Sequence, residues 1–223
     1  MNVKKALAEI ILIFIGVTIA IWFDNWNNDR INTKREIEIL TELDGDLEFL
    51  IHRLRQKIHD DSMALASGKI IYHDLLSNIN DYRDTLDRHY ARFYVFSVPG
   101  IKKTAFETMK SVGIDIITND TIRTGIIDLY DRTLNLVRWS MDWETTEFND
   151  KISPLLDRHI QLIEFLKQAR PISYRALKVD EEFINTLNNY NFQKQYRIEI
   201  VRERIVGIEK LQMDIKSEIT RLK

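Results

Sequence analysis

Apolar residues form one uninterrupted run near the start of the chain and recur at regular intervals afterwards. The run covers residues 10–23, and the polar residues 24–30 follow it directly. Its helix would be about 21 Å long against a hydrocarbon core of about 30 Å, and extension back through Ala6 brings it nearer to that length. A core helix apolar on all sides does not suit so polar a chain, and no signal-peptide cleavage site follows Phe23. We therefore expect a retained transmembrane helix.

Several side chains of this run suggest how it is held. Trp22 and Trp26 lie where an aromatic belt marks the membrane surface. Glu9, Gly16 and Ala20 share one helix face, and small residues four apart let two helices approach closely in lipid. This face predicts a contact between helices of several copies. In the alternative interpretation, Glu9 lies at the headgroup level and the small pair is a chance occurrence.

Beyond this anchor, two series of apolar residues recur at spacings of three and four, which is typical of long packed helices. With seven Gly and three Pro, the first Pro at residue 99, the sequence has few helix breakers. The anchor should thus continue into the first long helix. The two series pack against each other or form the seam of a homo-oligomer; they are Ile37, Leu40, Leu43, Leu47, Leu50, Leu54 and Ile58, and Val201, Ile205, Ile208, Leu211, Ile215, Ile219 and Leu222.

Shorter helices are expected between the two series. One ends near Asn78 and another near Arg92, although the aromatic content of residues 90–96 also suits a short strand. Thr104 and Glu107 have the spacing of a capping box, and Gly113 suits the end of that helix. The remaining predicted helices are one capped by Asn119 or Thr118 that reaches Trp143, one from Ser153–Pro154 to residue 170, and a short one over 181–188 before the last long helix.

The predicted fold class is all-α. A single N-terminal transmembrane helix continues into a bundle of long antiparallel helices. We assign the anchor and its polar collar to residues 1–31 and the helical soluble domain to residues 32–223.

Composition narrows the classes of function. The 223 residues include 32 basic and 34 acidic side chains, which are well mixed and give a net charge of −2. No strongly basic stripe is available to displace counterions, so no nucleic-acid partner is expected. The chain has no cysteine, which rules out disulfides, thiolate metal sites and a cysteine nucleophile.

Candidate chemistry is sparse. The five histidines are scattered without a helical zinc-binding pair, and the acidic residues around Gly45 lack the order of a calcium loop, so no metal is expected. No phosphate loop or nucleophile elbow is found, and we predict no catalytic residues, no cofactor and no enzymatic activity. Tyr130, Trp139 and Trp143 could wall a ligand pocket, with core packing as the more ordinary use of such residues.

Two motifs carry a resemblance to a known family. They are residues 9–20 with the trailing Asn25-Trp26-Asn27, and residues 105–113 followed by a helix with Ile117, Asn119, Arg123 and Tyr130. With them the sequence resembles an uncharacterised family of single-pass membrane proteins of Bacteroidota, a domain of unknown function. The resemblance implies an inner-membrane protein with a mainly helical soluble domain, and it brings no catalytic residues.

The sequence thus predicts a membrane-anchored, non-enzymatic interaction module, a scaffold or a sensor, that self-associates. Its predicted partners are the lipid bilayer, further copies of itself and a protein. The alternative is an oligomeric membrane effector or channel built on the face of Glu9, Gly16 and Ala20. Lys4 and Lys5 precede the anchor whereas acidic residues follow it, so the N-terminus is predicted in the cytoplasm and the soluble domain in the periplasm.

Overall fold

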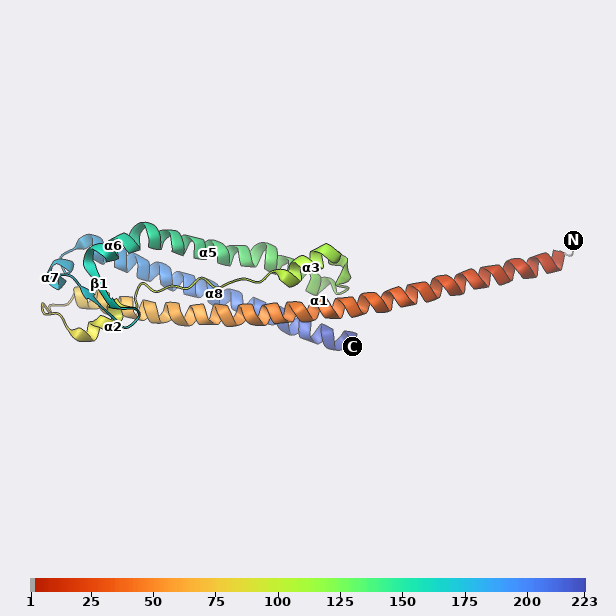
Figure 1. Ribbon diagram of the computed structural model, residues 1–223, viewed down its shortest axis with the longest axis horizontal. Coiled ribbons are helices and arrows are strands. Elements are labelled where there is room, and N and C mark those ends of the chain that lie inside the picture. Colours follow the sequence, from red (N-terminus) through yellow and green to blue (C-terminus); the bar gives the residue numbers. More distant parts are fainter. Residues whose placement is uncertain (1–2) are drawn as a thin grey trace.

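The computed structural model describes the backbone of residues 3–223 and the side chains of residues 11–223. Its elements form an elongated rod from which one helix projects (Figure 1). Helix α1 (Val3–Leu75) runs along the whole rod, and helix α8 (Glu181–Leu222) lies against it. A third line of helix is made of α4 (Asp120–Asp128), the π-helical turn η3 (Leu129–Thr133), α5 (Leu134–Glu147), the π-helical turn η4 (Phe148–Ile152) and α6 (Ser153–His159).

The first part of α1 stands clear of the bundle (Figure 1). Glu36 is the first buried residue among those whose side chains are described, and residues 11–32 are exposed. We call residues 11–35 the arm. The helix is continuous across residues 31 and 32, because no glycine or proline interrupts it there. Over the described residues, no helix combines the length and the apolar character needed to cross a membrane, so the predicted transmembrane helix is not supported.

The two apolar series face each other inside one chain. Leu40, Leu43 and Leu47 of α1 are buried in the same core as Val201 and Ile208 of α8. The interpretation in which the seam is filled by the C-terminal helix is therefore confirmed. The short helix predicted to end near Asn78 is the last part of α1, and the one predicted over 181–188 is the first part of α8, so neither is a separate helix.

The end of the rod away from the arm is built from short elements. The turn η1 (Asp84–Leu86) and helix α2 (Asp87–Tyr90) follow α1, and α7 (Tyr174–Leu177) precedes α8. Strands β1 (Ile160–Glu164) and β2 (Gln168–Pro171) form an antiparallel hairpin. The helix predicted from Ser153–Pro154 is present as α6, but it ends at His159 and not at residue 170. Of the two alternatives near residue 90, the helix forms, as α2, and residues 90–96 form no strand. Packing of β2 on α2 overrides the helical spacing, since Asp87 accepts hydrogen bonds from Gln168 and Arg170.

Near the arm, α3 (Thr104–Val112) and the turn η2 (Ile114–Ile116) form a corner. The predicted capping box is not formed: Lys103 is the N-cap, and the Ala105 N–H donates instead to the Asp46 carboxylate of α1, over 3.3 Å. Gly113 ends the helix with φ +118°, as its position predicted. Asn119 caps α4 by accepting from the backbone of Thr121 and Ile122, which confirms that part of the prediction.

Two apolar cores fill the rod. One lies toward the arm and packs α1, α3, the α4–α5 line and α8 together. The other lies at the far end and joins the last turns of α1 to α2, the hairpin and the start of α8. Along α1 the first core ends near Ile58 and the second begins at Ile71. The stretch between them holds the charged residues described next.

Candidate functional site

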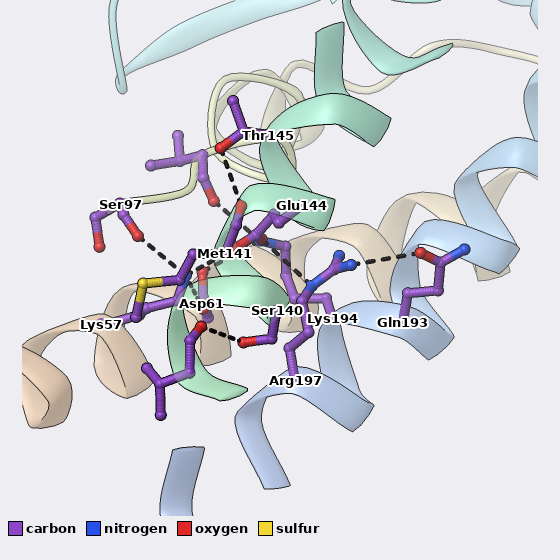
Figure 2. Close-up of polar contacts among 12 residues, drawn as sticks. Lys57, Asp61, Ser97, Ser140, Met141, Glu144, Thr145, Gln193, Lys194 and Arg197 are labelled. Carbon is purple, nitrogen blue, oxygen red and sulfur yellow. Dashed lines mark hydrogen bonds and ion pairs between the residues drawn. The ribbon is translucent and has the colours of Figure 1, made fainter. Parts of the chain in front are cut away.

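Six charged side chains are buried together in the middle of the rod, between the two apolar cores. We call them the buried ionic network: Lys57 and Asp61 of α1, Glu144 and Glu147 of α5, and Lys194 and Arg197 of α8. Figure 2 shows five of them converging from the three helices. Three cations and three carboxylates balance in formal charge. Burying ions is costly unless they are paired and hydrogen-bonded, so the contacts of each group decide whether the network is stable.

The two lysines have matching surroundings. The Lys57 ammonium donates to Glu144 at 2.8 Å, pairs with Asp61 at 2.9 Å and donates to the Ser97 carbonyl at 3.0 Å. The Lys194 ammonium donates to Glu144 at 3.0 Å and to Asp61 and the Val95 carbonyl, both at 3.2 Å. Each ammonium thus uses its three donors on two carboxylates and one backbone oxygen.

The two carbonyls belong to an extended segment, residues 95–103, which we call the strap. It has no regular secondary structure and runs along the rod from α2 to α3 (Figure 1). Besides the lysines, the Phe96 ring holds it by packing on Phe148 with a centroid separation of 4.9 Å. Because backbone carbonyls in a buried segment need donors, the lysines allow the strap to lie over the network.

Arg197 lies beside the lysines and is only partly paired. Its guanidinium donates to Glu147 at 3.3 Å and to Gln193 at 3.4 Å, and lies between the rings of Trp143 and Tyr190. Its Nε and Nη2 atoms have no hydrogen-bond partner within the described part of the chain, although Nε is 3.7 Å from Glu144. The aromatic faces supply part of the stabilisation that those bonds would give.

The pKa directions of Glu144 and Lys194 agree with an ion pair between these two groups. Burial alone would raise the pKa of Glu144, but the charges of Lys194, Lys57 and Arg197 outweigh burial and lower it below its ordinary value. Burial would likewise lower the pKa of Lys194, whereas Tyr190, Glu144 and Asp61 raise it above its ordinary value. Both directions favour the charged forms near neutral pH, which fits the ion pairs that Lys194 makes with Glu144 and Asp61.

The structure separates the three residues predicted to wall a pocket. Tyr130 is buried and stacks on Phe106, with the ring centroids 4.2 Å apart. Trp139 and Trp143 lie at the surface of α5, 5.7 Å apart. Tyr130 therefore packs in the core, which is the more ordinary of the two uses expected from the sequence. Trp139 instead lines a hollow at the surface together with Tyr196 of α8.

The predicted membrane-helix contacts lie on the arm. Gly16 and Ala20 are exposed, and a Cβ atom added at Gly16 would meet nothing within 4 Å. Trp22 and Trp26 are exposed as well. The side chain of Glu9 lies outside the described residues. The acidic residues around Gly45 lie along α1, where Asp44 pairs with Lys216 and Asp46 caps α3, and no metal-binding cluster is found among the described side chains.

The network was missed in the sequence, although a signal for it exists. Continuing the apolar spacing of α1 beyond Leu54 places Lys57 and Asp61 on the buried face. In α8, Lys194 and Arg197 hold the same position between Tyr190 and Val201. Charged residues at seam positions of two helices, with opposite signs available, are the pattern that indicates a buried ionic network.

This fold and site define the class: an elongated all-α protein with a small hairpin, a buried ionic network and an exposed apolar arm. A family described as "Family of unknown function (DUF6090)" matches residues 9–153 of the 223, and the chain belongs to this family. The match includes the arm, α3 and α5, but not the hairpin or α8. No curated protein and no solved structure matches the chain. The match confirms that the chain belongs to a family of unknown function, whereas the single-pass membrane character and the Bacteroidota source that the resemblance implied stay predictions.

Proposed function

We propose that the protein is a membrane-anchored helical interaction module, a scaffold or a sensor, that works without catalysis. The observation that carries this proposal is the arm. Its residues from Ile11 to Phe23 are exposed on every side of the helix, with Phe14 71% and Leu12 75% exposed. A helix that is apolar all round belongs in a core or in lipid, and the bundle does not cover this one.

The proposed partner of the arm is the hydrocarbon of a lipid bilayer, with Trp22 and Trp26 at its surface. The polar residues 24–30 come next, and the bundle begins at Glu36, about 20 Å along the helix from Phe23. The bundle would therefore stand off the membrane on a continuous helix. In the proposed topology the anchor lies in a bacterial inner membrane and the bundle in the periplasm.

A non-catalytic role fits the use of the buried charges. The six groups of the network neutralise one another and join α1, α5, α8 and the strap. The contacts in the middle of the rod are therefore specific ion pairs, each of which needs a defined geometry. Such networks fix which helix faces meet, and we propose this role here. Self-association through the face of Gly16 and Ala20 is part of the same proposal, because small residues allow close helix contact in lipid.

Membrane fractionation of the full chain tests the proposal. We expect recovery in the membrane pellet after an alkaline carbonate wash. The double variant Ile15→Lys/Ile19→Lys places two charges in the arm and should move the protein to the supernatant. Its circular dichroism should stay unchanged, because Ile15 and Ile19 are exposed and stand clear of the bundle. Met63→Lys, at an exposed apolar residue of the bundle, is the matched control and should still pellet.

Release of the wild-type chain by carbonate would contradict the anchor. A reporter fused after Lys223 that is active only in the cytoplasm would contradict the orientation. The channel alternative needs several copies around a pore, so a strictly monomeric protein in mild detergent would eliminate it.

A further inference from the structure

The side of the rod between α5 and α8 exposes large apolar residues of both helices. Trp139 is 60% exposed and Tyr196 is 56% exposed. Leu136 and Trp143 of α5 are exposed beside them, and Ile200 of α8 is half-buried. We call these five residues the α5–α8 face. Contiguous exposed aromatic surface on a soluble body usually marks a contact with another molecule.

A groove continues from this face toward the arm. One hollow is lined by Leu136, Trp139 and Tyr196, and a second by Gly125, Leu129 and Leu211. Each has a volume of about 270 Å³, and both include Glu203 and Arg204, so they adjoin. From Tyr196 to Leu211 the groove follows α8 for about 22 Å. It is long enough to contact a rod-shaped partner over four helical turns.

The charges of the groove favour a partner that, like the groove, carries both positive and negative side chains. Glu203 and Arg204 are neighbours on α8 and carry opposite signs, and the buried Arg204 Nε has no hydrogen-bond partner within the described part of the chain. In the hollow nearer the arm, Asp128 pairs with Arg132, so both signs of charge are present there too. A strongly acidic or basic partner would meet repulsion here. A second copy turned by a two-fold axis would bring each Glu203 to the partner's Arg204.

We propose that the α5–α8 face is the contact between two parallel copies of this chain, related by a two-fold axis along the rod. This inference rests on the proposed function, because two arms in one bilayer hold two rods side by side at the same height. Each aromatic residue of the face then meets the face of the other copy. Anchoring in one membrane also raises the effective concentration of the copies, so a contact of modest area suffices.

Cysteine cross-linking of the full chain in lipid vesicles tests the proposal, since the natural chain has no cysteine. We expect Tyr196→Cys and Gly207→Cys each to give oxidised dimer at least ten-fold above Met63→Cys, an exposed position of α1 outside this face. Positions 196 and 207 lie about 16 Å apart along α8, so an antiparallel pair could not link both. Yields no higher than that of Met63→Cys would overturn the proposal.

Charge reversal provides the second measurement. In the Tyr196→Cys background, Glu203→Arg and Arg204→Glu should each lower the dimer yield several-fold, because like charges then meet across the axis. The double reversal should restore it. Equal yields in all four proteins would contradict the charge pairing that selects a second copy.

The two proposals fail in different ways. If carbonate releases the chain but Tyr196→Cys still cross-links, the anchor is wrong and the face is right. If the chain pellets but cross-links only at the level of Met63→Cys, the face is wrong and the anchor stands. Circular dichroism of every variant shows whether the bundle remains folded.

Discussion

Gly68 and Asn191 show how closely α1 and α8 approach at the level of single residues. A Cβ atom added at Gly68 would lie 2.1 Å from the Asn191 Oδ1 atom. Asn191 is buried, and this oxygen has no hydrogen-bond partner among the described residues. The glycine at this point of α1 is therefore explained by the space that Asn191 occupies.

Substituting alanine at two glycines of α1 should have opposite effects. Gly68→Ala should lower the free energy of unfolding by about 1–3 kcal/mol, because the two helices must separate or Asn191 must move. Gly45→Ala, where a Cβ meets nothing within 4 Å, should raise it by up to about 1 kcal/mol through helix propensity. Urea denaturation measures both. Equal changes in the free energy of unfolding at the two positions would show that helix propensity alone determines the effect of the alanine.

Glu144 should make the stability depend on pH. The Lys194, Lys57 and Arg197 charges overcome the effect of burial and lower its pKa in the folded chain, whereas in the unfolded chain the pKa is about 4.3. A lowered pKa stabilises the fold above the unfolded value, and this stabilisation is lost as pH falls through the folded value. Loss of one partner of a buried ion pair costs about 3–5 kcal/mol, so Glu144→Gln should melt well below the wild type at pH 7.

The gap between the two melting temperatures should narrow as the pH falls below about 4, because the unfolded wild-type chain then takes up a proton at Glu144 before the folded chain does. Glu107→Gln is the matched control, since its pair with Lys110 is exposed and worth less than about 1 kcal/mol. A gap that stays constant with pH would show that Glu144 does not act through its charge.

Among the elements, the strap depends most directly on single side chains. Its Val95 and Ser97 carbonyls accept from Lys194 and Lys57, and Lys102 lies over the Phe49 ring of α1. Lys57→Met removes one of these donors, and a hydrogen bond to a charged group is worth about 1.5–3 kcal/mol. Amide hydrogen exchange over residues 95–103 should then speed up by on the order of ten-fold or more.

The control for the strap is Lys69→Met, which removes only the exposed hydrogen bond to Gln195. It should leave exchange in the strap unchanged. In Lys57→Met, the increase should be larger in the strap than in the hairpin, which the network does not contact. A uniform increase over the whole chain would indicate general destabilisation rather than release of the strap.

Local signals predicted some elements well and failed where distant packing decides. The Asn119 cap and the Gly113 helix end depend on neighbouring residues, and both are present. The spacing of Thr104 and Glu107 is an equally good local signal for a helix start. The residue that caps α3 is nevertheless Asp46 of α1, which lies far away in the sequence. Residues 155–166 have apolar residues at helical spacing, so the local pattern predicts a helix, and the contacts of β2 with Asp87 are visible only in the fold.

At the scale of the molecule, the regular spacing of the two apolar series predicted the two long helices that form the long axis of the rod. It could not show that α8 fills the seam within one chain, because intra- and intermolecular packing have the same period. The sequence limits the prediction of the network in a related way. The seam spacing of α1 and α8 indicates that charged residues are buried, but the pairs that they form depend on the registers of α1, α5 and α8.

The continuity of α1 makes the arm and the bundle one mechanical unit, and this has a measurable consequence. Val17 and Arg55 are 38 residues apart in the same helix, which corresponds to about 57 Å. Spin labels on Val17→Cys and Arg55→Cys should give a narrow distance distribution near that value. Asn28→Pro, in the exposed polar part of the arm, removes a helical hydrogen bond and kinks the helix, so the distribution should shorten and broaden. Asn28→Ala should leave it unchanged. A broad distribution in the unsubstituted background would mean that the arm moves independently, and a membrane event could then not be passed to the bundle through α1.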